Sequence, residues 1–376
     1  MHNLVRREVY EAAETLIIKI GSNVLTRDDD QLDEDRIRSL AEQIDRVIQS
    51  GRRVVVVSSG AVAAGIGVLG LKRRPQSLPE LQASAAAGQM RLMKAWEGAL
   101  GQRGRNIAQM LVTVNDFRQR RRYLNVRNTL RTLFGFGVVP VVNENDSVSI
   151  AEIALGDNDQ LAAMIASLVT NPLLVILSSV DGLYDGAPGA PDSSLIDVVR
   201  EPSESLSEYA ADEQSSAGRG GMKSKLHAIL NATSVGESVI LANGLRDRIL
   251  DRIADGENVG TLFLASGSSI PAWKRWIGYT TQPEGKLFLD DGALRAVVTE
   301  GRSLLAVGIT DVTGEFDQGA SVELVSSSGV IGRGLVNYSA AEIRIIRGRK
   351  SDQIPSLLGH VPYEEVIHRD NLVLRD

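Results

Sequence analysis

Two lysines stand beside glycines in positions where a phosphate could approach them. Lys19 interrupts the apolar run of residues 16–20 and is followed at once by Gly21. Because burying an unpaired ammonium is costly, we expect Lys19 to face an anion, and the glycine would admit a phosphate to the backbone. Lys225 ends the segment 218–225 (GRGGMKSK), a glycine loop that enters a predicted helix. Both lysines are candidates for binding a phosphoryl group, although a structural salt bridge would also explain Lys19.

A third glycine turn, residues 58–65 (SSGAVAAG), opens a helix directly after a predicted strand. Free backbone N–H groups and the positive helix end favour an anion there, but Ser59 could equally be a simple N-cap. Neither common nucleotide-binding motif is present. The segment 218–225 does not place Gly-Lys-Ser/Thr directly after the turn as a P-loop does, and residues 65–67 (GIG) lack the third glycine of a dinucleotide-binding fingerprint.

Two loops rich in carboxylates and amides lie close together in the sequence. Residues 143–146 (NEND) and 156–159 (GDND) flank a hairpin-like segment, residues 147–155. Their side chains can hold the ammonium and carboxylate of an amino acid, or orient cationic catalytic groups, because charge-assisted hydrogen bonds are strong and directional. Turn formation or N-capping would explain Asp157 taken singly. With the two lysines, these loops favour phosphoryl transfer, in which positioning and charge neutralisation do most of the work.

The composition excludes several other classes of protein. The chain of 376 residues has no Cys, so disulfides, thiolate metal sites and a Cys nucleophile are ruled out. Its four histidines show no metal-ligand spacing, which argues against a metalloenzyme or a His-dependent triad: His2, His227, His360 and His368. The net charge of -6 argues against a nucleic-acid coat. Residues 1–14 contain no signal-peptide core, and no apolar run approaches the roughly 20 residues of a membrane span, so we expect a soluble cytoplasmic protein.

The elements that position these residues alternate between strands and helices. Apolar strand-like runs occur at residues 16–20, 54–57, 108–112, 138–142, 173–177, 238–242 and 261–264. Helix-length segments occur at residues 34–50, 81–100, 123–134, 159–169, 223–235 and 246–254. This order predicts an α/β domain with an open, mostly parallel sheet covered by helices on both faces. Ligands then collect at the carboxyl ends of the strands.

The sequence pattern changes after the stretch 265–272, which contains Ser, Gly and Pro. Short strand-like runs at residues 286–289, 303–309 and 321–325 alternate with turns and show little helical periodicity. We therefore predict two domains, a catalytic domain over residues 1–270 and a small β-rich domain over residues 280–376.

Six motifs, taken together and in order, resemble those of bacterial glutamate 5-kinases within the amino acid kinase superfamily. They are residues 18–22 (IKIGS), 58–62 (SSGAV), 142–146 (VNEND), 156–159 (GDND), 180–184 (VDGLY) and 220–225 (GGMKSK). The resemblance covers nearly the whole chain from Leu16 and implies a three-layer α/β/α amino acid kinase fold. It also implies ATP-dependent phosphorylation of the side-chain carboxylate of L-glutamate to L-glutamyl 5-phosphate, the first step of proline biosynthesis.

The resemblance also assigns roles to individual residues. Ser59, Asp146 and Asn158 would contact glutamate, Lys19 and Lys225 would flank the transferred phosphoryl group, and Asp159 would orient both lysines. The nucleotide would bind Lys19, Ser178, Ser179, Arg219, Gly220, Gly221, Met222, Lys223, Ser224 and Lys225. This chain departs from many relatives on the adenine side, since they have an acidic residue in place of Ser179 and a Thr in place of Arg219.

Mg²⁺ would accompany ATP, and we assign it no protein ligand, because this ion is held largely by phosphate oxygens and water. Family likeness further implies feedback inhibition by proline and a homo-oligomer. Two alternatives remain open. The same fold could phosphorylate carbamate, acetylglutamate, aspartate or a nucleoside monophosphate, or the chain could be an RNA-binding protein with an inactive kinase domain.

The region from about Gln282 resembles a PUA domain, a pseudo-barrel found in RNA-modifying enzymes, on the evidence of residues 301–309 (GRSLLAVGI). RNA binding is supported only by a basic cluster of Arg344, Arg347, Arg349 and Lys350. Acidic residues interspersed through the same region favour a structural or regulatory appendage instead: Asp290, Asp291, Glu315 and Asp317.

Overall fold

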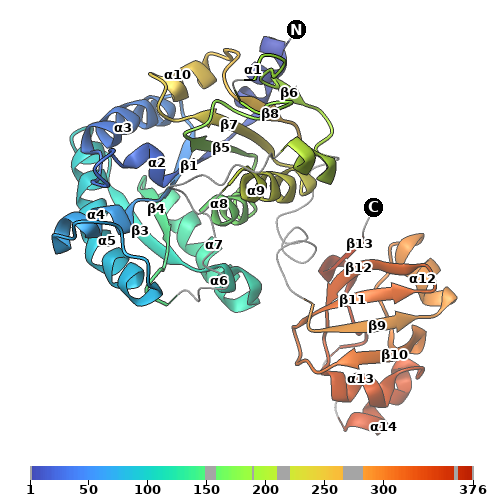
Figure 1. The fold of residues 1–376 in the computed structure, drawn as a ribbon. Helices are drawn as coiled ribbons and strands as arrows, with labels where there is room; N and C mark the ends of the chain where they lie inside the picture. The colour runs from blue at the N-terminus through green and yellow to red at the C-terminus, as the bar shows by residue number, and fades with distance from the viewer. Residues whose placement is uncertain are drawn as a thin grey trace. The chain divides into compact units, whose positions relative to one another are not determined.

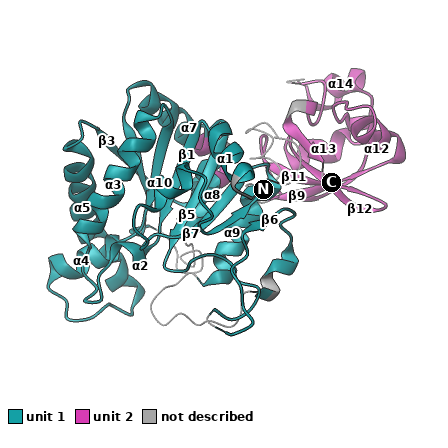
Figure 2. Ribbon diagram, turned by 90° about the horizontal axis from the view of Figure 1, so that it is seen from above, with its two compact units in different colours: residues 1–116, 124–269 teal, residues 117–123, 270–376 magenta. Residues whose placement is uncertain are grey.

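The computed structural model describes residues 2–148, 158–188, 190–209, 221–265, 283–359 and 363–374. The chain separates into two compact units, coloured in Figure 2. One comprises residues 1–116 and 124–269, and the other comprises residues 117–123 and 270–376. The predicted boundary between residues 270 and 280 lies outside the described residues and stays a prediction.

The first unit is built on an eight-stranded sheet in the order β3-β4-β2-β1-β5-β7-β8-β6 (Figure 1). Its strands are β1 Thr15–Ile20, β2 Arg53–Ser58, β3 Ile107–Val112, β4 Val139–Glu144, β5 Pro172–Ser178, β6 Val198–Val199, β7 Ser238–Asn243 and β8 Thr261–Phe263. Neighbouring strands pair in parallel except β7 with β8. The carboxyl ends of β1, β2, β4, β5 and β7 therefore lie along one edge, as predicted for a mostly parallel α/β sheet.

Helices connect these strands. They are α1 His2–Ala12, α2 Ser22–Leu25, α3 Glu34–Gln49, α4 Ala61–Leu69, α5 Leu78–Gly101, α6 Val114–Arg118, α7 Arg120–Gly135, α8 Asn158–Ala166, α9 Met222–Ser234 and α10 Ile249–Ala254. The predicted helices match this set within a few residues. The charged pattern of residues 1–14 does not predict α1, whose Arg6 is buried and donates hydrogen bonds to the carbonyls of Asp197, Val259 and Gly260.

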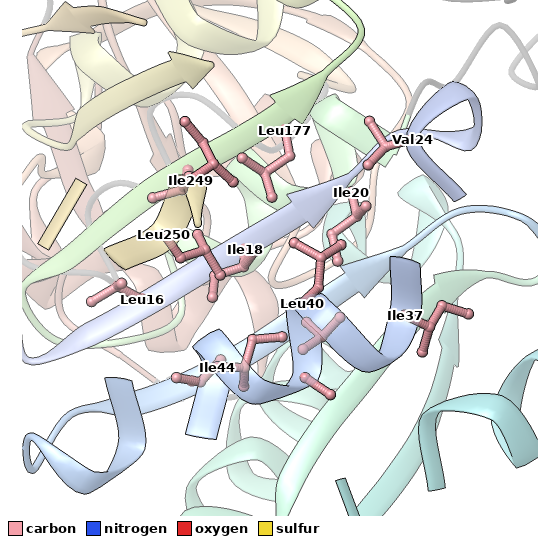
Figure 3. Close-up of a cluster of buried hydrophobic side chains, with 14 of the residues drawn as sticks. Leu16, Ile18, Ile20, Val24, Ile37, Leu40, Ile44, Leu177, Ile249 and Leu250 are labelled. Atoms are coloured by element: carbon pink, nitrogen blue, oxygen red, sulfur yellow. The ribbon is translucent and has the colours of Figure 1, made fainter. Parts of the chain in front are cut away.

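The central strand β1 separates two faces of the sheet. Leu16, Ile18 and Ile20 pack into a buried cluster with residues of α3 and α10 (Figure 3). Because alternate residues of a strand point to opposite faces, Ile17 and Lys19 point to the other face, against which α8 packs. This alternation places the ammonium of Lys19 on the side of the sheet where α8 begins.

Helices α4 and α5 cross unusually closely at two glycines. A Cβ atom on Gly65 would lie 1.8 Å from the carbonyl oxygen of Ser84, and one on Gly88 would lie 1.9 Å from the carbonyl oxygen of Ala61. No side chain fits in either position, so the approach of the two backbones requires glycine at both. The crossing draws α5 toward the loop that follows β2.

The second unit contains a five-stranded sheet in the order β10-β9-β11-β12-β13. Its elements are β9 Gly285–Leu289, α12 Asp291–Val298, β10 Ile309–Gly314, β11 Ser321–Ser326, β12 Gly329–Leu335, α13 Ala340–Ile346, α14 Ile354–Leu358 and β13 Leu372–Leu374. The sheet and helices enclose a separate buried core that includes Leu287, Val322 and Tyr338. A β-rich second unit is confirmed, although it is more helical than the sequence pattern indicates.

Two local predictions for this unit are wrong. The run 303–309 does not form a strand: residues 306–308 form a 3₁₀-helix, and only Ile309 begins β10. The segment after the run 286–289, where the sequence pattern predicts a turn, instead begins α12, because the carboxylate of Asp290 accepts a hydrogen bond from the backbone N–H of Ala293 at 2.7 Å and caps the helix.

Candidate active site

Two lysines that are distant in the sequence converge on one carboxylate at the carboxyl edge of the first sheet. The Nζ atom of Lys19 on β1 lies 2.5 Å from Oδ1 of Asp159, and Nζ of Lys225 on α9 lies 3.0 Å from Oδ2 of the same residue. Asp159 is 0% exposed and Lys19 is 2% exposed. Each ammonium therefore has its counter-charge in a site largely removed from water.

Local structure explains why the three side chains meet. Asp159 lies in the first turn of α8, where the partial positive charge of the helix end stabilises a carboxylate. Lys225 lies in the first turn of α9, which begins after Gly221, and α8 and α9 pack together. Beside them, Gly21 leaves room near the ammonium of Lys19, since a Cβ atom there would lie 3.7 Å from Nζ.

The cluster of Lys19, Lys225 and Asp159 forms one end of the site, the lysine end. A chain of hydrogen bonds between side-chain amides, the amide end, lies beside it. Nδ2 of Asn158 donates to Oγ of Ser59 at 2.9 Å and to Oδ1 of Asn143 at 3.0 Å. Nδ2 of Asn143, at the end of β4, donates to Oε1 of Gln89 on α5 at 2.9 Å. Adjacent residues of α8 thus serve two ends of one site, with Asn158 at the amide end and Asp159 at the lysine end.

The loop that carries Ser59 is fixed from behind by a buried tryptophan. Nε1 of Trp96 on α5 donates to Oγ of Ser58 at 2.9 Å, and both side chains are fully buried. Gly60, the residue after Ser59, has a φ of 103°, a conformation that favours glycine. Helix α4 starts directly after it, so backbone N–H groups at its first turn are directed toward the same edge of the sheet.

The ends of β5 and β7 form a neighbouring polar region. Ser178 is buried and its carbonyl accepts from the N–H of Gly244 at 2.8 Å, while Ser179 is exposed. Two nitrogens of Arg246 lie 3.0 and 3.1 Å from the carboxylate oxygens of Asp181. This hydrogen bonding, with a further one from Asn243, holds the pKa of Asp181 below its ordinary value.

Most of the predicted site residues can be located. Lys19, Ser59, Asn158, Asp159 and Lys225 are brought together as described. Asp146 lies partly buried in the turn after β4, and Met222, Lys223 and Ser224 lie in the first turn of α9. Arg219 and Gly220 lie outside the described residues, as do residues 149–157, which include most of the predicted hairpin-like segment.

Sequence reasoning missed Gln89, Asn143 and Trp96 as site residues. Asn143 belongs to a motif that was singled out, but neither Gln89 nor Trp96 follows a strand or a glycine turn. Gln89 contacts Asn143, 54 positions away, and Trp96 contacts Ser58, 38 positions away. A local sequence pattern cannot predict contacts between residues so far apart. The one available signal is Gly88, whose neighbour Gln89 is carried to the sheet edge by the close helix crossing.

Two negative findings apply to the parts of the chain that the structure describes. Within the described ranges, no three His, Asp or Glu side chains gather closely enough to hold a metal ion. Among the helices described, none is both long and apolar enough to cross a membrane.

The basic cluster of the second unit is partly neutralised. A guanidinium nitrogen of Arg344 lies 2.7 Å from Oε1 of Glu315, and Arg347 forms an ion pair with Asp311. Hydrogen bonding to Glu315 raises the pKa of Arg344 above its ordinary value. Two of the four predicted cations therefore already have carboxylate partners.

Comparisons with known proteins identify the families that this chain matches. The model of the amino acid kinase family matches residues 14–243, and that of the PUA domain matches residues 285–358. Glutamate 5-kinase of Rhodopirellula baltica is 46% identical over 374 residues, covering 99% of this chain and 96% of that protein. Glutamate 5-kinase of Thioalkalivibrio sulfidiphilus is 47% identical over 370 residues, which cover 98% of this chain and 99% of that protein. The solved structure of carbamate kinase from Giardia lamblia bound to AMP-PNP covers 68% of this chain and 100% of its own, with 17% identity and a TM-score of 0.48.

Proposed function

The chain belongs to the glutamate 5-kinase family of amino acid kinases, and from that premise we propose that it transfers the terminal phosphoryl group of ATP to the side-chain carboxylate of L-glutamate. The products are L-glutamyl 5-phosphate and ADP, and the reaction is the first step of proline biosynthesis. The observation that carries the chemistry is the convergence of Lys19 and Lys225 on Asp159 at the edge where parallel sheets bind ligands.

The reaction brings two anions together, and the lysine end of the site suits that task. The side-chain carboxylate of free glutamate has a reference pKa of about 4.3 and is ionised near neutral pH, so no general base is needed. Lys19 and Lys225 neutralise charge on the migrating phosphoryl group and on the two oxygens between which it passes. The carboxylate attacks the terminal phosphorus in line, and the bond to the bridging oxygen of ADP breaks.

Asp159 acts as a positioning residue for the two ammonium groups. One of its oxygens faces each lysine, at 2.5 and 3.0 Å, so both donors are held before ATP binds. Groups fixed in advance need little reorganisation during the reaction, which is the main source of electrostatic catalysis.

Mg²⁺ fits this site as a companion of ATP. The described residues supply no cluster of three acidic or His side chains, and the oxygens of Asp159 face the two lysines. A cation held largely by phosphate oxygens and water is compatible with that donor set. When bound, Mg²⁺ supplies further neutralisation of phosphate charge.

The amide end of the site suits an amino acid acceptor. Ser59 and Asn158 present short polar groups, and Asp146 provides a carboxylate that can pair with an α-ammonium group. An acetylated acceptor would lack that ammonium and could not form this ion pair with Asp146.

The test is to incubate the full chain with ATP, Mg²⁺ and one acid at a time, and to trap acyl phosphate with hydroxylamine. Glutamate is expected to yield hydroxamate in large excess over aspartate, acetylglutamate and carbamate. Release of ADP with a nucleoside monophosphate but no hydroxamate with any acid would refute the proposal, and no turnover at all would favour the RNA-binding alternative. For Asp146→Ala, we expect KM for glutamate to rise at least tenfold, the loss of roughly one charged hydrogen bond, and an unchanged KM would remove Asp146 from the glutamate site.

Further parts of the proposal rest on family likeness alone. They are inhibition by proline at the acidic loops and assembly into a homo-oligomer, while a cytoplasmic location stays a prediction from the sequence composition. RNA binding by the PUA domain also stays a prediction, and the pairing of Arg344 and Arg347 with carboxylates leaves less positive charge for it.

A further inference from the structure

The hydrogen bonds at the amide end fix the orientation of three side-chain amides. The backbone N–H of Glu144 can only donate, and it donates to Asn143 at 2.9 Å, so the atom it meets must be Oδ1. The other end of the Asn143 amide is then the nitrogen, which donates to Gln89. The Gln89 atom that accepts must be Oε1, and the free end of its amide is the Nε2 donor.

The same logic fixes Asn158. Its amide meets Oδ1 of Asn143, an acceptor, and therefore presents Nδ2 there. One donor and one acceptor of these amides take no part in the hydrogen bonds described. Among the residues that the structure describes, Nε2 of Gln89 and Oδ1 of Asn158 are shielded from solvent and have no hydrogen-bond partner. Buried polar atoms without partners are rare, and each calls for an explanation.

The two ends of the site indicate what meets these atoms. The reacting carboxylate of the acceptor must lie at the lysine end, where phosphoryl transfer takes place. The amide end then receives the part of the acceptor that does not react, which in an amino acid is an α-carboxylate and an α-ammonium. An α-carboxylate requires donors such as Nε2 of Gln89, and an α-ammonium requires acceptors such as Oδ1 of Asn158.

We propose that Gln89 is a specificity-determining residue of the acceptor site, whose Nε2 donates to the α-carboxylate of the bound amino acid while its Oε1 holds Asn143. This inference rests on the proposed function and adds a residue to it. Gln89 reaches the site because Gly88, its neighbour, packs against Ala61 on α4 with no room for a side chain. Trp96, two turns later on α5, fixes Ser58 in the same way, so one helix positions both sides of the amide end.

The test compares two acceptors that differ only at the α-carboxyl group: L-glutamate and L-isoglutamine, its α-amide, in which the side-chain carboxylate is retained. Both yield hydroxamate if phosphorylated. In Gln89→Met, which lacks both amide atoms, KM for glutamate is expected to rise about tenfold to a hundredfold, the range of a hydrogen bond to a charged group. KM for isoglutamine should change much less, so the preference for glutamate falls, while KM for ATP stays the same.

A second variant separates contact with the substrate from support of Asn143. Gln89→Glu keeps an oxygen that can accept from Asn143 but has no N–H and adds a negative charge. We expect it to lose glutamate binding at least as severely as Gln89→Met and to favour isoglutamine, whose amide can donate to the new carboxylate. A role confined to holding Asn143 would instead leave Gln89→Glu near the wild type, and that result would overturn the proposal.

The chain offers a matched control on α3. Gln43 is buried, and both ends of its amide have partners: Oε1 accepts from the N–H of Leu250 at 2.9 Å, and Nε2 donates to the carbonyl of Ser39 at 3.2 Å. Gln43→Met should lower the melting temperature and leave the ratio of the two acceptor KM values unchanged. An equal rise in both KM values in Gln89→Met would show a purely structural role and refute the inference.

These outcomes are distinguishable from failure of the proposed function. If the wild-type chain forms no hydroxamate with glutamate, the proposed function and the inference fall together. If the wild type is active and Gln89→Met keeps its preference for glutamate over isoglutamine, only the inference is refuted. Should Gln89→Met not fold, Gln89→Glu still decides the question, because it retains the bond to Asn143.

Discussion

Replacing Asp159 by Asn is the most direct test of the lysine end, because it removes one charge and almost no volume. The side chain of Asp159 is 0% exposed and contacts two ammonium groups at 2.5 and 3.0 Å. In Asp159→Asn the oxygen can accept from only one lysine, and the new NH₂ group faces the other, which leaves two donors in opposition. Two buried ammonium groups then lose the carboxylate that both of them contact.

The expected size of the effect follows from the distances. With an effective dielectric constant of about 20 and a separation of about 3 Å, each attraction is worth roughly 5 kcal/mol before desolvation is subtracted. Measured losses on breaking a buried pair are about 3–5 kcal/mol, because the cost of burying the charges offsets much of the attraction. We expect Asp159→Asn to lower the free energy of unfolding of the first unit by that amount.

Hydrogen exchange of α8 in the full-length chain is the suitable assay, since the two units need not unfold together and a single global transition is not assured. Inorganic tripolyphosphate provides a second readout. Because an anion can replace the missing carboxylate between the lysines, it should raise the protection of α8 more in Asp159→Asn than in the wild type. A double-mutant cycle with Lys19→Met should show coupling, since the second change removes one of the two ammonium groups that contact residue 159.

One result would refute this reasoning. If Asp159→Asn keeps its α8 protection within about 1 kcal/mol of the wild type, the three charges are not coupled as described. If kcat is also unchanged, Asp159 does not position the lysines during turnover.

Three further predictions also concern the first unit. Lys19→Met and Lys225→Met, which keep most of the side-chain volume, should each lower kcat at least about a hundredfold in the hydroxamate assay, the effect of deleting one preorganised donor. Arg6→Met should destabilise the first unit by about 2–4 kcal/mol in chemical denaturation with KM for glutamate unchanged, because three carbonyls lose a buried donor. Arg246→Gln should lower the melting temperature near neutral pH. Arg246 lowers the pKa of Asp181 in the folded protein. The stability that this pair adds is therefore fully present above the pKa of Asp in the unfolded chain, about 3.9, and is lost as pH falls through the lower pKa of the folded state. The difference in melting temperature between variant and wild type should accordingly disappear in acid.

The sheet of the first unit could be predicted because its strands obey simple rules of burial. Every residue of β1 is buried, so the strand reads as a continuous apolar run, and Lys19 is conspicuous within it. Helix α1 could not be predicted in this way, because what fixes it is the burial of Arg6 among carbonyls from residues more than 190 positions away. In the second unit, Asp290 could begin either a turn or a helix, because Asp is common in both positions. Only the hydrogen bond from the backbone N–H of Ala293 shows that it caps a helix.

Part of the site could likewise be predicted and part could not. Lys19 lies near the end of β1, Ser59 follows β2 and Asn158 begins α8, so the topology alone brings them to one edge. The pairing of both lysines with Asp159 was implied by family likeness, and the structure supplies the distances. Gln89 and Trp96 lie within α5, away from any loop, and their polar atoms meet the site only because two helices pack at glycines.

The two ends of the site are therefore held by different forces. At the lysine end, charge attraction over 2.5 to 3.0 Å selects the geometry, and each partner lies in or beside a recognisable motif. At the amide end, the position of Gln89 depends on the contact of Gly88 with Ala61, where a shift of the helix backbone by a few tenths of an ångström would change a hydrogen bond. Because Asn158 and Asp159 are adjacent on α8 but face different ends, we expect substitutions in the α4–α5 crossing to alter which acceptor binds and to preserve the contacts of the two lysines with Asp159.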